Sequence, residues 1–107
     1  MQVFNLSDMV KGWFIGDFEP TLLHTTDFEV AVKRYKKGDS ESRHLHKLAV
    51  EYTVIIAGEV IMNNIKYKAD DIIKIDRNES TDFFLIIYAV TVVVKAPSCK
   101  NDKYAVD

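Results

Sequence analysis

Apolar and polar residues alternate along several short stretches of the chain, which is the pattern of strands with one buried face. Residues 28–33 give the clearest alternation. Other runs are short and rich in Val and Ile, whose branched side chains favour pleated sheet; they cover residues 50–56, 59–62, 71–75 and 89–95. No ten-residue helical pattern lies between them, so we expect an all-β sandwich or barrel.

Turn-forming residues fall at the boundaries of these runs. Asn63-Asn64 predicts a two-residue hairpin between residues 60–62 and 65–67, because Asn tolerates the positive φ of a type I′ turn. Ala57-Gly58 predicts a turn in the same way. Only the first dozen residues could hold a helical turn, with Ser7 as its candidate cap.

Residues 82–95 do not fit a simple hairpin, because the middle of the segment, from Leu85 to Tyr88, is apolar where a polar turn would be needed. One interpretation is a bent, continuous strand with its side chains in the core. The other is a subunit interface, since an exposed apolar strand favours association. The two interpretations have about equal support in the sequence.

The composition suits one globular domain with a single core, since the 107 residues are 48% hydrophobic and 28% charged. A net charge of −2 argues against a nucleic-acid partner. The longest apolar stretch, residues 83–94, is shorter than the roughly 20 residues of a spanning helix, so no membrane partner is expected. The first residues carry no visible secretory signal, and the lone Cys99 cannot form an intramolecular disulfide. We therefore expect a cytoplasmic protein.

Candidate metal ligands occur in the segment Arg43-His44-Leu45-His46. On a strand, this spacing puts both imidazoles on one face, about 6 to 7 Å apart along the chain, close enough to share a metal ion. A carboxylate follows at Glu51, on a strand whose two faces are both largely apolar, where it needs a partner. The alternative is that the histidines are ordinary polar residues near a turn and that Glu51 is solvated.

Glycines bracket this group: five residues separate Gly38 from His44, and six separate Glu51 from Gly58. The full spacing resembles the first motif of the cupin superfamily at every fixed position. The resemblance implies a single-domain, cupin-type jelly-roll β-barrel over residues 1–107, with a core at 28–95 and an aromatic N-terminal arm at 1–27. It also implies that His44, His46 and Glu51 bind a divalent metal ion, such as Fe, Mn, Ni or Zn, for which this N/O ligand set is suited.

The second cupin motif is only partly present, in residues 69–81. Asn78 takes the position of a glycine, which suits a positive φ. Thr81 stands where the fourth ligand, a histidine, is expected, and a neutral hydroxyl binds divalent ions weakly. Three protein ligands are therefore predicted, with Asp82 or Glu79 as a possible fourth if the phase of the strand allows it.

Arg34 is a further candidate for ligand binding, because it is in phase with the apolar residues Phe28, Val30 and Val32. If those residues face the interior, Arg34 projects inward near His44 and could hold a carboxylate or phosphate. The basic run around it is otherwise read as a solvated strand end. Trp13 and its aromatic neighbours are interpreted as a cover for one barrel end, as a dimer contact, or as a stacking surface for a sugar or a base.

The leading functional hypothesis is a metal-binding cupin that acts on or recognises a small polar ligand, either a sugar derivative or a carboxylate, as an isomerase or oxygenase would. A first alternative is a non-catalytic binding module with a decayed metal site. A second is a metal-free isomerase or epimerase in which Glu51 and His44 act as acid and base. A homodimer is expected, formed through residues 85–88 and the N-terminal aromatic residues.

Overall fold

The computed structural model describes all 107 residues, Met1 to Asp107. It contains eight strands: β1 (Trp13–Ile15), β2 (Glu29–Tyr35), β3 (Ser40–Leu45), β4 (Val50–Met62), β5 (Ile65–Lys68), β6 (Ile72–Ile75), β7 (Thr81–Ala96) and β8 (Tyr104–Ala105). The one helical element is the 3-10 turn η1 (Leu6–Asp8), whose cap is the Asn5 side chain and not the expected Ser7. No helix in the chain is long and apolar enough to cross a membrane.

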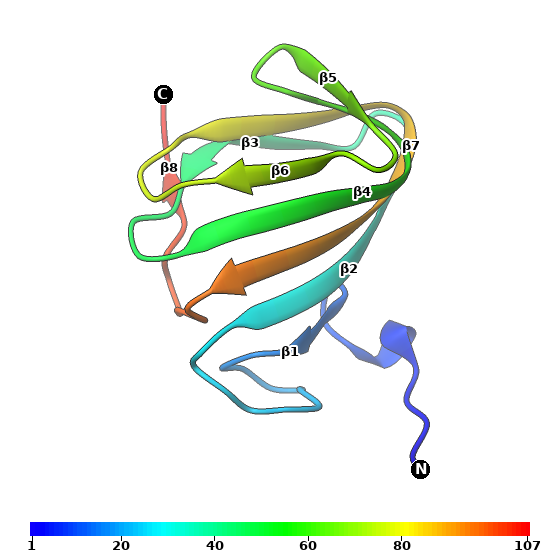
Figure 1. Cartoon of the computed structure of the whole chain (residues 1–107), viewed down its shortest axis with the longest axis vertical. Coiled ribbons are helices and arrows are strands. Elements are labelled where there is room, and N and C mark those ends of the chain that lie inside the picture. The colour runs from blue at the N-terminus through cyan, green and yellow to red at the C-terminus, as the bar shows by residue number, and fades with distance from the viewer.

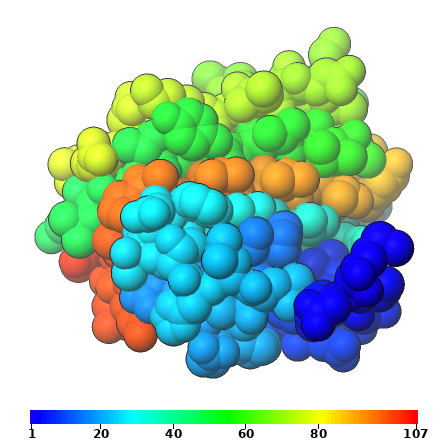
Figure 2. All heavy atoms as spheres, turned by 60° about the horizontal axis from the view of Figure 1, so that its bottom comes forward, coloured from blue at the N-terminus to red at the C-terminus, as the bar shows by residue number.

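The strands form two layers that share the long strands β4 and β7 (Figure 1). One layer has the order β1, β2, second half of β7, first half of β4, β6. The other has β8, β3, first half of β7, second half of β4, β5. In Figure 2 the orange part of β7 lies between β4 in green and β2 in cyan. The ladder ends at β1, β5, β6 and β8, so the sheet does not close into a strict barrel.

The predicted hairpin at Asn63-Asn64 is confirmed: both residues have positive φ, 50° and 65°, and Met62 pairs with Ile65. The turn expected at Ala57-Gly58 is wrong, because β4 continues through it with a shift in register. Gly58 has φ 84°, and a Cβ there would lie 1.8 Å from the main-chain oxygen of Tyr88. The close approach of β7 therefore requires glycine at a bulge in β4.

Residues 82–95 belong to one continuous strand, β7, which confirms the strand of the first interpretation, but not its expectation that the side chains of residues 86–88 lie in the core. Leu85 is fully buried, whereas Ile86, Ile87 and Tyr88 are exposed where β7 passes from one layer to the other. The buried apolar cluster lies between the layers and consists of Ile55, Val60, Met62, Ile75, Phe83, Leu85 and Ala89.

The phase expected for residues 28–34 is wrong. Glu29 and Ala31 are buried, and Lys33 and Tyr35 line the interior, whereas Arg34 is exposed on the outer face. The expectation assumed that the more apolar face of this strand is the inner one. The inner face of this strand borders a polar cavity instead, so its polar residues point inward.

Candidate functional site

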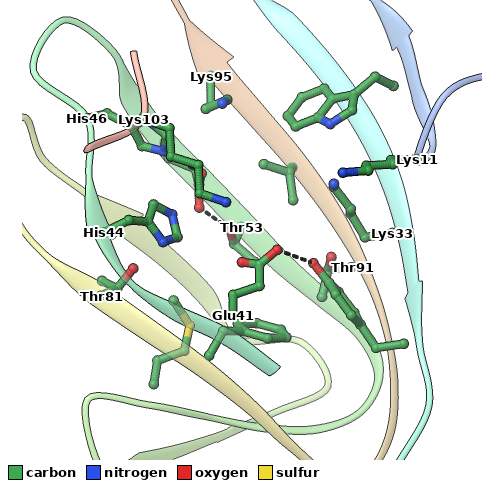
Figure 3. Close-up of a pocket in the computed structure, with 16 residues that line it drawn as sticks. Lys11, Lys33, Glu41, His44, His46, Thr53, Thr81, Thr91, Lys95 and Lys103 are labelled. Atoms are coloured by element: carbon green, nitrogen blue, oxygen red, sulfur yellow. Dashed lines mark hydrogen bonds and ion pairs between the residues drawn. The ribbon is translucent and has the colours of Figure 1, made fainter. Parts of the chain in front are cut away.

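A cavity of about 230 Å3 opens between the inner faces of the two layers (Figure 3). Met62 and Phe83 belong to both the buried cluster and the cavity wall, so the apolar core forms part of the cavity lining. Of the residues selected from the sequence, His44, His46, Glu51 and Thr81 all line this cavity. The structure therefore brings together side chains from β3, β4, β7 and the segment that follows β3.

His46 is 6% exposed and is held at both ring nitrogens. Its Nδ1 lies 2.6 Å from the main-chain oxygen of Asp102, which only accepts, so Nδ1 carries the proton and donates. Nε2 lies 3.6 Å from Oε1 of Glu51. A neutral imidazole would thus direct a lone pair at a carboxylate. This contact becomes favourable when a cation, either a proton or a metal ion, lies between the two atoms.

His44 is fixed in a similar way. Its Nδ1 donates to the main-chain oxygen of Ser42 at 2.9 Å, which leaves Nε2 free. The ring centroids of His44 and His46 are 5.4 Å apart, with an angle of 77° between the ring planes. Across the strand pair, His44 lies opposite Thr81, the residue at the position where the sequence pattern would place a fourth ligand.

The Glu51 side chain lies in a mostly enclosed position, with 17% of its surface exposed. Burial by itself raises the pKa of Glu51, but contact with Nε2 of His46 when that atom carries a proton, the charge of Lys95 and the Thr53 hydroxyl together hold the pKa below its ordinary value. The Thr53 hydroxyl donates to Oε2 at 3.1 Å. We expected a partner for this buried carboxylate, and His46, Lys95 and Thr53 supply it.

The cavity also contains charged residues that the sequence analysis did not select. Glu41 and four lysines line it: Lys11, Lys33, Lys95 and Lys103. The ammonium groups of Lys33 and Lys95 each lie 5.0 Å from the ring centroid of Trp13, which favours a cation–π contact. Reading residues 29–35 in the opposite phase would have revealed Lys33. No local pattern marks Lys103, which reaches the site from the segment before β8.

Tyr35 and Glu41 form a second polar contact in the cavity. The Tyr35 hydroxyl donates to Oε1 of Glu41 at 3.5 Å. Burial raises the pKa of Tyr35, and the charges of Glu41 and Glu51 raise it further, so the phenol remains protonated. Tyr35 thus acts as a hydrogen-bond donor on this wall.

Three candidates lie outside the cavity. Arg34 is on the outer face of β2. Asp82 follows Thr81 and points to the opposite side of β7, where it contacts Arg43 at 3.2 Å and accepts from the main-chain nitrogen of Asn63 at 2.8 Å. Glu79 is exposed and accepts from the main-chain nitrogen of Asp76. The strand phase therefore excludes Asp82 as the fourth ligand.

The donor chemistry of the site fits a divalent ion, because both histidines present Nε2 while a main-chain carbonyl holds Nδ1, a common arrangement around ligating histidines. His46 and Glu51 already form a close pair. No three His, Cys, Asp or Glu side chains in the chain gather closely enough to hold an ion together. The His46–Glu51 pair would therefore supply the first two donor atoms to a metal ion at this position, and His44 lies beside this pair.

No known family model matches the chain, and no curated protein is similar to it in sequence. Solved structures are similar in fold. An uncharacterised conserved protein with a double-stranded β-helix domain from Klebsiella pneumoniae is 19% identical with a TM-score of 0.70, over 100% of this chain and 98% of that one. An RmlC-like cupin from Methanocaldococcus jannaschii is 21% identical with a TM-score of 0.63, over 69% of this chain and 73% of that one.

The DMSP lyase DddQ from Ruegeria pomeroyi is 15% identical with a TM-score of 0.69, over 85% of this chain and 48% of that one. At these identities the similarity establishes the fold. The chain has the cupin-type, double-stranded β-helix fold, as the spacing from Gly38 to Gly58 predicted.

Proposed function

We propose that this protein is a small cupin that binds a divalent metal ion through His44, His46 and Glu51 and acts on a small polar ligand, either a sugar derivative or a carboxylate. The observation that carries the proposal is the contact between Nε2 of His46 and Oε1 of Glu51 at 3.6 Å, with Nδ1 of both histidines held by main-chain oxygens. This contact leaves room for a cation at the point where two lone-pair donors meet.

Each proposed ligand has a defined role. His46 and Glu51 supply the first two donor atoms, and His44 supplies the third. Thr81 beside His44 is a weak ligand, so positions on the ion stay open for water or the ligand. The mixed N/O donor set suits Fe, Mn, Ni or Zn. When bound, such an ion polarises a ligand oxygen or activates water.

The fold is compatible with catalysis, since one protein of similar fold is a lyase. Within the cavity of this chain, Glu51 is ionised, which suits a base or a metal ligand. The phenol of Tyr35 stays protonated and can donate a hydrogen bond to a ligand oxygen. An isomerase or an oxygenase is the class of enzyme that these groups support.

A metal-free acid–base reaction is the second candidate. It is favoured by the direct His46–Glu51 contact and by the lack of a gathered three-ligand group. In this case a proton, and not a metal ion, lies between Nε2 and Oε1, and Glu51 acts as base with His44 or His46 as acid. A non-catalytic module that only binds the ligand would keep the same cavity without using either chemistry.

Elemental analysis of protein purified without a nickel column, followed by titration with Fe(II), Mn(II) and Zn(II), separates these candidates. We expect near-stoichiometric metal in the parent and its loss in His46→Ala and Glu51→Gln. His24→Ala is the matched control, because it removes the remaining histidine, which pairs with Asp17 and does not line the cavity. If no ion binds the parent more tightly than His46→Ala, the metal proposal fails and acid–base chemistry replaces it.

The homodimer is also a proposal. Ile86, Ile87 and Tyr88 are 38%, 43% and 56% exposed at the bend of β7, and an apolar surface of this kind favours association. Sedimentation of the parent and of an Ile87→Lys variant tests this. A dimer that Ile87→Lys dissociates is expected, and a strictly monomeric parent at high concentration contradicts it.

A further inference from the structure

The charges around the cavity are unbalanced. Four lysines line it against two carboxylates, Glu41 and Glu51, so with neutral histidines two positive charges are in excess. The whole chain has the opposite sign, with a net charge of −2. The cavity is thus a local concentration of positive charge in an acidic protein, which favours the entry of an anion.

Most of these lysines lack a carboxylate partner. Lys95 lies 3.7 Å from Glu29, but Lys11, Lys33 and Lys103 make no ion pair. Loss of water contact lowers the pKa of Lys33, and the charges of Lys95 and Lys11 lower it further against the opposing effect of Glu41. Partly buried charges in proteins are normally paired, so a missing partner at Lys33 points to a bound anion.

The backbone places Lys11 next to this group at some cost. Lys11 has φ 52° and Gly12 has φ 84°, in a tight turn closed by the bridge between Val10 and Trp13. A Cβ at Gly12 would lie 1.9 Å from the main-chain oxygen of Val32, so this turn packs directly on β2. A non-glycine residue in the left-handed region is strained, because its Cβ comes close to the main chain. The turn retains this backbone strain, and it places Lys11 at the cavity.

An orphaned polar group lies on the same wall. The hydroxyl of Thr91 is buried and has no hydrogen-bond partner, and Thr91 pairs across the strands with Lys33. Thr91 is 1% exposed and lines the cavity. A buried hydroxyl without a partner is unfavourable, and an oxygen of a bound ligand would satisfy it.

We propose that the cavity binds a small dianion, either a phosphate ester or a dicarboxylate, through Lys11, Lys33 and the Thr91 hydroxyl. Figure 3 shows Lys11 and Lys33 on one side of the cavity, with His44, His46 and Lys103 on the other. The anionic group lies on the lysine side, and the rest of the ligand extends toward the histidines. This proposal names the class of ligand for the same cavity. It rests on the proposed function for the role of His44 and His46.

The size of the cavity limits the ligand. Its volume of about 230 Å3 is below the range of about 300–1,000 Å3 that is usual for drug-sized ligands. The cavity therefore suits a dianion with a carbon skeleton of a few atoms.

Trp13 provides the readout, because it is the only tryptophan of the chain and contacts Lys33 and Lys95. The experiment follows its fluorescence, with calorimetry in parallel, on protein treated with a chelator. The probes are inorganic phosphate, with its charge on one group, succinate, with separated charges, acetate as a monoanion and glycerol as a neutral molecule. We expect saturable binding of phosphate or succinate and at least about tenfold weaker binding of acetate.

Lys33→Met should weaken binding of the preferred dianion by about tenfold or more. Arg34→Met is the matched control: it removes the same charge from the next residue of β2, on the outer face, and should leave binding unchanged. Lys11→Met, on an exposed turn, repeats the test if Lys33→Met does not fold. Equal weakening by Lys33→Met and Arg34→Met, or no dianion binding, overturns the inference.

The two proposals fail separately. Chelated protein lacks the metal but retains the lysines, so dianion binding persists in it if the lysine site exists. Retained dianion binding without any tight metal binding removes only the metal proposal. Tight metal binding with no response to phosphate or succinate removes only the dianion.

Discussion

The main-chain oxygen of Asp102 accepts a hydrogen bond from Nδ1 of His46, a residue 56 positions earlier in the chain. The carboxylate of the same Asp102 accepts from the main-chain nitrogens of Lys47, Leu48 and Ala49 at 3.0–3.1 Å. One residue of the C-terminal segment therefore holds both the imidazole and the loop that follows it. Asp102 is a positioning residue for His46.

Asp102→Ala should destabilise the protein by about 3 kcal/mol, because it leaves the donors of residues 47–49 without their charged acceptor. The substitution should also weaken metal binding, because the loop after His46 is no longer held and the imidazole is less well positioned. Urea unfolding and metal titration measure the two effects. Asp107→Ala, at an exposed position of the same segment, is the control and should change neither. Wild-type stability in Asp102→Ala would contradict this role.

Gly58 and Gly38 offer a matched pair of substitutions, because both have φ near 85° but only Gly58 is crowded. Gly38→Ala meets no atom within 4 Å and should cost only the backbone strain of about 1 kcal/mol. Gly58→Ala places a methyl against the Tyr88 carbonyl and should cost about 4 kcal/mol. Chemical denaturation of both variants measures the difference. Equal costs would mean that β4 and β7 separate easily at the bulge.

Thr91→Val replaces a buried hydroxyl that has no partner with a methyl group of similar size. In protein without ligand, the variant should be as stable as the parent or up to about 1 kcal/mol more stable. Thermal unfolding in phosphate-free buffer measures this. The gain should shrink when a saturating dianion is added, because only the parent then uses the hydroxyl. Clear destabilisation in the absence of ligand would show that the hydroxyl already has a partner.

His24 should make stability depend on pH near neutrality. Its hydrogen bond to Asp17, together with Glu19, raises the pKa of His24 above its ordinary value. The folded state therefore binds this proton more tightly than the unfolded state. The contribution is fully present below the unfolded pKa of about 6.5 and is lost as the pH rises through the folded pKa. The difference in unfolding midpoint between the parent and His24→Gln should be largest at about pH 5.5 and should vanish at about pH 8.5. A difference independent of pH would exclude the ion pair as its source.

The fold was largely predictable because its local rules agree with one another. The Asn63-Asn64 hairpin depends on two residues that tolerate positive φ, and the spacing from Gly38 to Gly58 identified the cupin-type architecture. The bulge at Gly58 was not predictable as such. Its cause is a contact with Tyr88, thirty residues later, and a glycine that avoids a distant carbonyl looks the same in sequence as a glycine in a turn.

The site was predictable only on its histidine side. His44, His46 and Glu51 follow one spacing pattern, and all three line the cavity. Lys33 was missed because periodicity assigns the apolar face to the interior, and in this strand the interior face borders a polar cavity. Lys103 and Asp102 reach the site from the end of the chain, where the sequence carries no pattern that links them to β3.

The sharing of β4 and β7 between both layers has a consequence for ligand entry. Because each strand runs through both layers, the cavity walls cannot swing apart as two rigid bodies about a flexible hinge. Two parts of the cavity lining belong to neither shared strand: the Lys11-Gly12 turn and the segment with Lys103. The main-chain nitrogen of Val32 donates to the Gly12 oxygen and holds this turn on β2. Ligand entry would then depend on motion of the exposed Lys11 and Lys103 side chains, while the strand framework limits the size of the ligand.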